Sequence, residues 1–392
     1  MAITPEPRIR IKMSISELDR RWKAVREAMK KDNLDFLIMQ NYTGILGGYV
    51  KWFTDMSAHN NYPFTLIFPR EDDMITIKHG PRQSKDSTIP GIKKQINVPA
   101  LPSFSFSNTF EAEMVAEELA KYPNCRIGMV GEGYINVAFY NYLTGQLKSA
   151  KFSDASDLVD NIKAVKSEEE IKHIKEICAI QDAAFDYALS RVVPGRRDYE
   201  VLADIMHYCM MAGSEEANLA VGSARPGSAT PSGGNGESGS RIIQKGDQVT
   251  ILIETSGPSG YFAEIMRTVC LGKIPEELQA QYEVAQKAQK ISLDLIKPGA
   301  DAITIWQAVN QYLKSTGYPE EKRLLSHGIG YDMMERPSVQ IGETMKMRAG
   351  MSLAAHATVS TPKAFAAVCE NHLVTETGNI CLHKTPQKIF TK

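Results

Sequence analysis

The chain has 392 residues, of which 43% are hydrophobic and 23% charged, the usual composition of a globular protein of about two domains. The 45 basic and 46 acidic residues give a formal net charge of −1, so no single-sign field favours nucleic acid or an anionic membrane as a partner. The six cysteines form no C-x-x-C pair, and the first residues contain no apolar run. We therefore expect reduced thiols and a cytoplasmic protein that does not enter the membrane.

Helical and strand-like segments alternate over the first 160 residues. Ser14, with a carboxylate three residues later at Glu17, has the form of a helix N-terminus. Apolar residues follow at helical spacing, at Leu18, Trp22, Val25 and Met29. Another helix is predicted at 110–122, and strands are predicted at 34–39, 63–69, 74–78 and 126–130. This alternation favours a smaller mixed α/β domain over residues 1–160.

Residues 161–392 have the pattern of helices packed on an antiparallel sheet. Helices are predicted from Glu168 to just before Pro194 and at 199–211, 277–296 and 303–315. Strands are predicted at 249–254, 260–270, 351–361 and 368–375. Between them, residues 222–240 are rich in Gly, Ser and Pro, which fits either a flexible surface loop or a loop at the mouth of a pocket.

Four motifs follow one another along this second half. GDQV at 246–249 leads to GYFAEIMRT at 260–268, and SHGIGYD at 326–332 is followed by AGMSL at 349–353 with VTETG at 374–378. In this order they resemble the creatinase/prolidase/methionine-aminopeptidase superfamily. The resemblance implies an α+β protein with a pita-bread catalytic domain at 161–392 and a creatinase-like N-terminal domain at 1–160. It also implies a homodimer that acts on a small-molecule substrate.

Peptidases of that superfamily hold two divalent metals with two Asp, one His and two Glu. The positions that match this ligand set are Glu254, Glu264, His327, His356 and Glu370. The first two are ten residues apart, one fewer than in the superfamily, so Ile253 competes with Glu254 for the first ligand position. The imidazole of His356 cannot bridge two metals as a carboxylate can. The resemblance therefore implies either no metal or at most one ion (Fe, Zn or Mn) held by Glu264, His327, His356 and Glu370.

Other positions are candidates for substrate binding, and some peptide-handling groups are missing. We assign substrate binding to Glu254, Tyr261, Glu335, Trp52 and Phe53, with the last two as an aromatic wall in the partner subunit's pocket or as core residues. Met334 occupies the place of a superfamily histidine that contacts the substrate amide, and residues 222–240 contain no histidine. A thioether donates no proton, so we expect Xaa-Pro dipeptides to be poor substrates.

The sequence is compatible with three functions. The first is a small-molecule C–N hydrolase or lyase for a cationic or zwitterionic substrate, in which Glu264 and Glu370 bind the substrate or a metal and His327 and His356 exchange protons. The second is a metal-dependent Xaa-Pro-type peptidase with an unusual ligand set. The third is a non-catalytic binding protein that keeps the fold.

Overall fold

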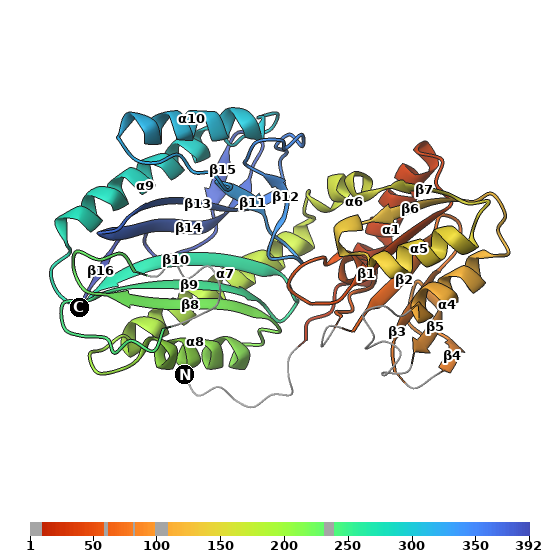
Figure 1. Ribbon diagram of the computed structural model, residues 1–392, viewed down its shortest axis with the longest axis horizontal. Coiled ribbons are helices and arrows are strands. Elements are labelled where there is room, and N and C mark those ends of the chain that lie inside the picture. The colour runs from red at the N-terminus through yellow and green to blue at the C-terminus, as the bar shows by residue number, and fades with distance from the viewer. Residues whose placement is uncertain (1–9, 59–61, 81–82, 99–108, 231–238) are drawn as a thin grey trace. The chain divides into compact units, whose positions relative to one another are not determined.

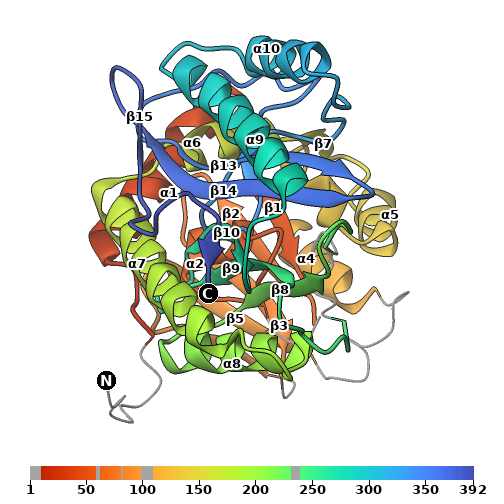
Figure 2. The same ribbon diagram turned by 90° about the vertical axis from the view of Figure 1, so that its left-hand side faces the viewer.

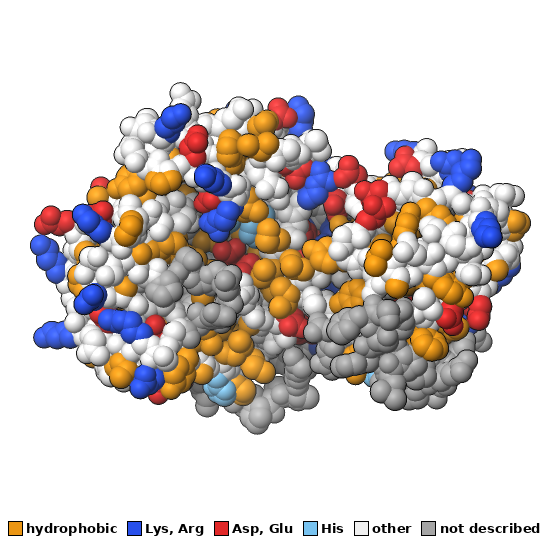
Figure 3. Space-filling view, viewed as in Figure 1, with side chains coloured by type: hydrophobic (Ala, Val, Ile, Leu, Met, Phe, Trp, Pro, Cys, Tyr) orange, Lys and Arg blue, Asp and Glu red, His pale blue; other side chains and the backbone are white. Residues whose placement is uncertain are grey.

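The computed structural model describes residues 10–58, 62–80, 83–98, 109–230 and 239–392. It contains two compact units, Lys12–Lys163 and Ala164–Lys392, and residues 10 and 11 belong to the second (Figure 1). Basic and acidic side chains are interspersed on the face drawn in Figure 3, as the near-zero net charge suggests. Among the described residues, no helix has the length and apolarity that a membrane span requires.

The smaller unit is a seven-stranded mixed sheet with helices, in the strand order β4-β5-β3-β2-β1-β6-β7. The strands are β1 (Phe36–Asn41), β2 (Phe64–Pro69), β3 (Met74–His79), β4 (Gln83–Asp86), β5 (Ile92–Val98), β6 (Arg126–Val130) and β7 (Lys151–Asp154). The helices are α1 (Ile15–Lys31), α2 (Tyr49–Thr54), α4 (Phe110–Leu119), α5 (Val137–Gln146) and α6 (Ser156–Lys163). The Ser14 hydroxyl accepts the Glu17 N–H at 3.1 Å, so α1 begins where the sequence predicts.

Trp52 and Phe53 lie in the interior of this unit. Their side chains are 1% and 0% exposed. The backbone carbonyls of both residues are tied to α1, by the Arg21 guanidinium and the Trp22 indole N–H, each at 2.8 Å. Neither ring is therefore exposed to form a substrate-binding wall, and the alternative assignment as core residues holds.

A carboxyl group is buried between α4 and the sheet. Glu111 Oε2 accepts hydrogen bonds from the Thr65 hydroxyl at 2.6 Å and from the Gln40 amide at 3.2 Å. Burial outweighs both bonds and raises the pKa of Glu111 from 4.5 to about 7. The unfolded chain therefore ionises this group at lower pH than the folded protein does, so its stabilising contribution is complete below pH 4.5 and is lost as the pH rises through about 7.

Glu111→Gln should remove this pH dependence. At pH 8 we expect the variant to be more stable than the natural protein by up to about 3 kcal/mol, because the shift of the pKa no longer opposes folding. At pH 4.5 the difference should be small. Urea unfolding at both pH values measures it, with the exposed Glu117→Gln on the same helix as control. An identical pH dependence in Glu111→Gln and the natural protein would contradict the assignment.

The larger unit is built on a nine-stranded sheet, which is antiparallel except for the parallel pair of β10 with β16. The main path is β12-β11-β13-β14-β10-β9-β8, with β15 paired to β14 and β16 to β10. The strands are β8 (Ala217–Ala224), β9 (Gln248–Ser256), β10 (Phe262–Cys270), β11 (Ser326–Gly328), β12 (Glu335–Ser338), β13 (Ser352–Thr361), β14 (Ala364–Val374), β15 (Asn379–Cys381) and β16 (Phe390–Thr391). The helices are α7 (Glu168–Arg191), α8 (Asp198–Met211), α9 (Glu276–Leu295) and α10 (Ala302–Ser315).

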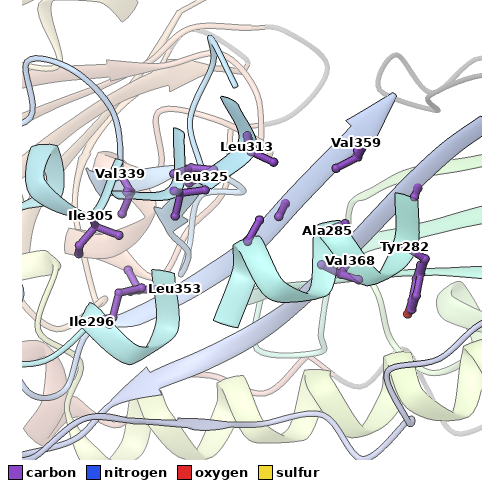
Figure 4. Packing of buried hydrophobic residues seen from close by; sticks show 14 of the residues in the cluster. Tyr282, Ala285, Ile296, Ile305, Leu313, Leu325, Val339, Leu353, Val359 and Val368 are labelled. Atoms are coloured by element: carbon purple, nitrogen blue, oxygen red, sulfur yellow. The ribbon is translucent and has the colours of Figure 1, made fainter. Parts of the chain in front are cut away.

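All four helices pack on one face of this sheet. Ile253 and Ile265 belong to a core with α7 and α8, and Val368 belongs to a core with α9 and α10 (Figure 4). Met266 pairs with Cys369, so Ile265 and Val368 point to the same side. Figure 2 shows α9 lying along β13 and β14. The alternate residues of β9, β10, β13 and β14 therefore point to the opposite face.

Candidate active site

Two carboxylates lie opposite each other on the face of the larger sheet that the helices do not cover. Glu254 of β9 pairs directly with Glu264 of β10 in the antiparallel register. Both are buried, at 4% and 8% exposure. Ile253 points to the helix-covered core, so Glu254 and not Ile253 supplies a donor on this face. The ten-residue spacing noted in the sequence is thus the spacing of a cross-strand pair.

His327 comes to the same place from β11. Its Nδ1 lies 2.9 Å from the Gly328 carbonyl, so Nδ1 carries the donated proton and Nε2 is turned toward the carboxylates. Nε2 is 3.4 Å from Glu264 Oε2. A ring held in this tautomer can bind a metal or accept a proton through Nε2.

His356 of β13 lies beside His327, with ring centroids 5.5 Å apart. The imidazole is only partly accessible to solvent. Loss of solvation lowers its pKa from 6.5 to about 4, against the opposing pull of Glu264. His356 is therefore neutral at pH 7, able to accept a proton or to donate its own ring N–H.

The pKa values of Glu254 and Glu264 are shifted in opposite directions. Burial, and then the charge of Glu264, raise the pKa of Glu254 well above 4.5, although the Asn218 amide donates to it at 2.8 Å. Burial acts on Glu264 in the same direction, but His327 and His356 outweigh it and bring the pKa of Glu264 to about 2. Of the two carboxyls, Glu254 is therefore the one that keeps its proton to higher pH.

The thiol of Cys369 lies on this face, where the sequence predicted the carboxylate of Glu370. Cys369 pairs with His356 across β13 and β14 and interacts with the Glu264 side chain, and burial raises its pKa well above 9. Sequence reasoning missed Cys369. Asn218 and Met333, whose sulfur lies 3.7 Å from the Asn218 amide nitrogen, were also missed.

Glu370 is on the helix-covered face, so the expectation that it joins Glu264 and the histidines in one cleft is not met. It pairs with Ala355, one position away from the His356–Cys369 pair. Its Oε2 accepts from the Arg267 guanidinium at 2.6 Å, and its Oε1 accepts from the Gln387 amide at 3.1 Å. Successive residues of a strand point to opposite sides, which separates Glu370 from the site.

Two further candidates are engaged in contacts of their own. The Tyr261 hydroxyl donates to Glu170 Oε1 at 2.7 Å, and its side chain is 1% exposed. The Glu335 carboxylate accepts from Lys166 at 2.5 Å, both side chains being almost fully buried. These contacts tie the start of α7 to the sheet, and they give both residues a structural role. Met334 is exposed, at 42%.

The donor set fits one divalent ion better than two. A ligand atom from each of Glu254, Glu264 and His327 lies within 4.8 Å of the other two, as three ligands of a single ion require. A bridged pair needs carboxylates at the positions that His356 and a protonated Cys369 occupy here. The expected single-ion set therefore changes, with Glu254 in place of Glu370.

The helix-backed sheet and its buried carboxylates and imidazoles define a pita-bread protein of the hydrolase type. Residues 172–377, more than half of the chain, match the metallopeptidase family M24. The chain belongs to this family, so the resemblance to the creatinase/prolidase superfamily is confirmed.

Similar proteins agree with this placement. The Xaa-Pro dipeptidase of Pyrococcus horikoshii is 27% identical over 262 residues, which cover 66% of this chain and 74% of that protein. The probable dipeptidase PepE of Mycobacterium tuberculosis is 26% identical over 238 residues, covering 60% and 63%. The prolidase structure from Thermococcus sibiricus superposes with a TM-score of 0.81 at 18% identity, covering 97% of this chain and all of that one. The predicted fold is confirmed.

Proposed function

We propose that this member of the family is a hydrolase that cleaves the amide bond of a dipeptide-sized substrate at a site holding one divalent ion. The observation that carries the proposal is the convergence of Glu254, Glu264 and His327. Two of the similar proteins named above are called dipeptidases, one for Xaa-Pro substrates and one a probable dipeptidase. Xaa-Pro dipeptides are accordingly the first substrates to test, although Met334, which replaces a superfamily histidine, led us to expect that they are poor substrates.

Each residue has a defined task in this proposal. A bound divalent ion would polarise the substrate carbonyl and make water a better nucleophile at neutral pH. Glu254 and Glu264 would supply its negative ligands, and ion binding would favour the ionised form of Glu254, whose pKa burial raises. Neutral His356, beside His327, is placed to donate a ring N–H to the amide or to take a proton from the reacting water.

A second candidate rests on a different observation. The pKa of Glu254 is raised and that of Glu264 is lowered, and His356 and Cys369 occupy the positions where a metal pair would need bridging carboxylates. This arrangement suits a metal-free hydrolase or lyase, in which the Glu264 carboxylate binds a compact cationic or zwitterionic substrate and Glu254 donates a proton.

Metal content and activity together separate the two candidates. The protein is purified without chelator, and its metal is compared with that of Glu264→Gln. We expect the variant to lose one ion per chain, and we expect chelation to abolish Xaa-Pro dipeptide hydrolysis, with divalent metal restoring it. Equal metal content in both proteins, with turnover of small zwitterions in the presence of chelator, would favour the metal-free candidate. Turnover of neither substrate class would count against both candidates and would favour the third function, binding without catalysis.

A further inference from the structure

A second group of metal-binding side chains lies on the helix-covered face of the same sheet. Short β15 pairs with β14, and Cys381 stands directly opposite His372 in this ladder. Glu370 is two residues before His372 and therefore points to the same side. One donor atom from each of the three lies within 4.8 Å of the other two.

The imidazole of His372 is fixed, with one nitrogen unused. The Asn379 amide nitrogen donates to the carbonyls of Leu293 and Ile296, at 2.7 and 3.1 Å. The Asn379 oxygen is thereby oriented to accept from His372 Nδ1, at 3.0 Å. His372 is 5% exposed, and its Nε2 has no hydrogen-bond partner among the described residues. A buried ring nitrogen in this state is costly unless something binds it.

The distance to the nearest carboxylate suits a shared ion. His372 Nε2 is 3.5 Å from Glu370 Oε1, which is long for a hydrogen bond. Two N or O ligands at about 2.0–2.1 Å from a tetrahedral Zn²⁺ are themselves about 3.4 Å apart. Arg267 holds the other oxygen, Oε2, so Oε1 remains turned toward the histidine, where it also accepts from Gln387 at 3.1 Å.

We propose that Glu370, His372 and Cys381 bind one thiophilic divalent cation, Zn²⁺, with solvent as the fourth ligand. One thiolate, one imidazole and one carboxylate are ligands that Zn²⁺ accepts in tetrahedral geometry. Cys381 is exposed, which gives the ion and its water access from solvent. The bound ion joins the three-residue strand β15 to β14, on the face opposite Glu254, Glu264 and His327.

Cobalt provides the test, because thiolate ligation gives Co²⁺ a charge-transfer band in the near ultraviolet. The full-length protein, stripped of metal, is titrated with Co²⁺. We expect the band to reach the intensity of one thiolate-bound Co²⁺ per chain, to disappear in Cys381→Ser and to persist in Cys369→Ser, the matched thiol control on the other face. Glu264→Gln should keep the band, so this outcome is independent of the proposed hydrolase.

Zinc analysis supplies the second readout. After dialysis against a low concentration of Zn²⁺, Cys381→Ser should hold one Zn²⁺ per chain fewer than the natural protein, with an unchanged circular dichroism spectrum. A natural protein without the cobalt band would overturn the proposal. So would a band that survives in Cys381→Ser or disappears in Cys369→Ser.

Discussion

His327→Ala should lower kcat/KM by about 10²–10⁴ for whichever substrate the protein turns over, the effect expected for a lost proton-transfer group or metal ligand. Its Nε2 is directed at Glu264 by the bond from Nδ1 to the Gly328 carbonyl, and no other described side chain is placed to take that position. Under the single-metal proposal, the variant also loses its ion. Steady-state kinetics and metal analysis of the same preparation measure both effects.

The matched control is His207→Ala, since His207 is exposed on α8, away from the sheet face that carries the site. Its kcat/KM and metal content should equal those of the natural protein. Circular dichroism shows whether His327→Ala is folded. A folded His327→Ala with full activity would remove His327 from the site, and with it both candidate functions.

The order of elements in the larger unit could be predicted from the sequence because its patterns are strong. The hydroxyl-to-carboxylate spacing from Ser167 to Glu170 predicts the start of α7, and both halves of that capping box are formed. The GDQV and GYFAEIMRT segments predict the β9–β10 hairpin, and they bring Glu254 and Glu264 together. The SHGIGYD and AGMSL segments place His327 and His356 on neighbouring strands.

The assignment of Glu370 failed for a reason that lies in β14 itself. Every residue from Ala364 to Val374 is buried, because helices cover one face and the site occupies the other. Such a strand shows no alternation of polar and apolar residues, so its sequence does not reveal which residues point to which face. Glu370 carries the carboxylate that the superfamily's ligand set requires, whereas the register places its neighbour Cys369 on the site face.

The sequence did not predict strand β8, because its last residues belong to the segment rich in Gly, Ser and Pro. Residues 222–240 have a loop-like composition, yet their first three residues, 222–224, complete β8, which pairs with β9 from Ala217 to Ala224. Gly222 and its neighbours gain their extended conformation from that pairing and not from intrinsic preference. Residues 231–238 of the expected loop lie outside the described part of the chain.

Glu370→Gln should destabilise the metal-free protein by about 3–5 kcal/mol, the usual cost of removing one partner from a buried ion pair. Arg267 is 0% exposed, and Glu370 is the carboxylate that neutralises it, at 2.6 Å. The other hydrogen-bond acceptors of Arg267 are backbone carbonyls, which carry no full negative charge. They belong to Met266, Cys369, Thr385 and Pro386. Urea unfolding at pH 7 in the presence of chelator measures the loss, with the exposed Glu376→Gln as control.

The pH dependence of the stability tests whether the loss comes from the charge of Glu370. Burial alone would raise the pKa of Glu370, but His372 and Arg267 outweigh it and lower the pKa from 4.5 to about 2. The stabilisation is therefore complete above pH 4.5 and is lost as the pH falls toward 2, and the shift corresponds to about 3 kcal/mol. The difference in the free energy of unfolding between the natural protein and Glu370→Gln should therefore decrease as the pH falls from 4.5 toward 2. A variant that keeps full stability but loses kcat would instead return Glu370 to the active site.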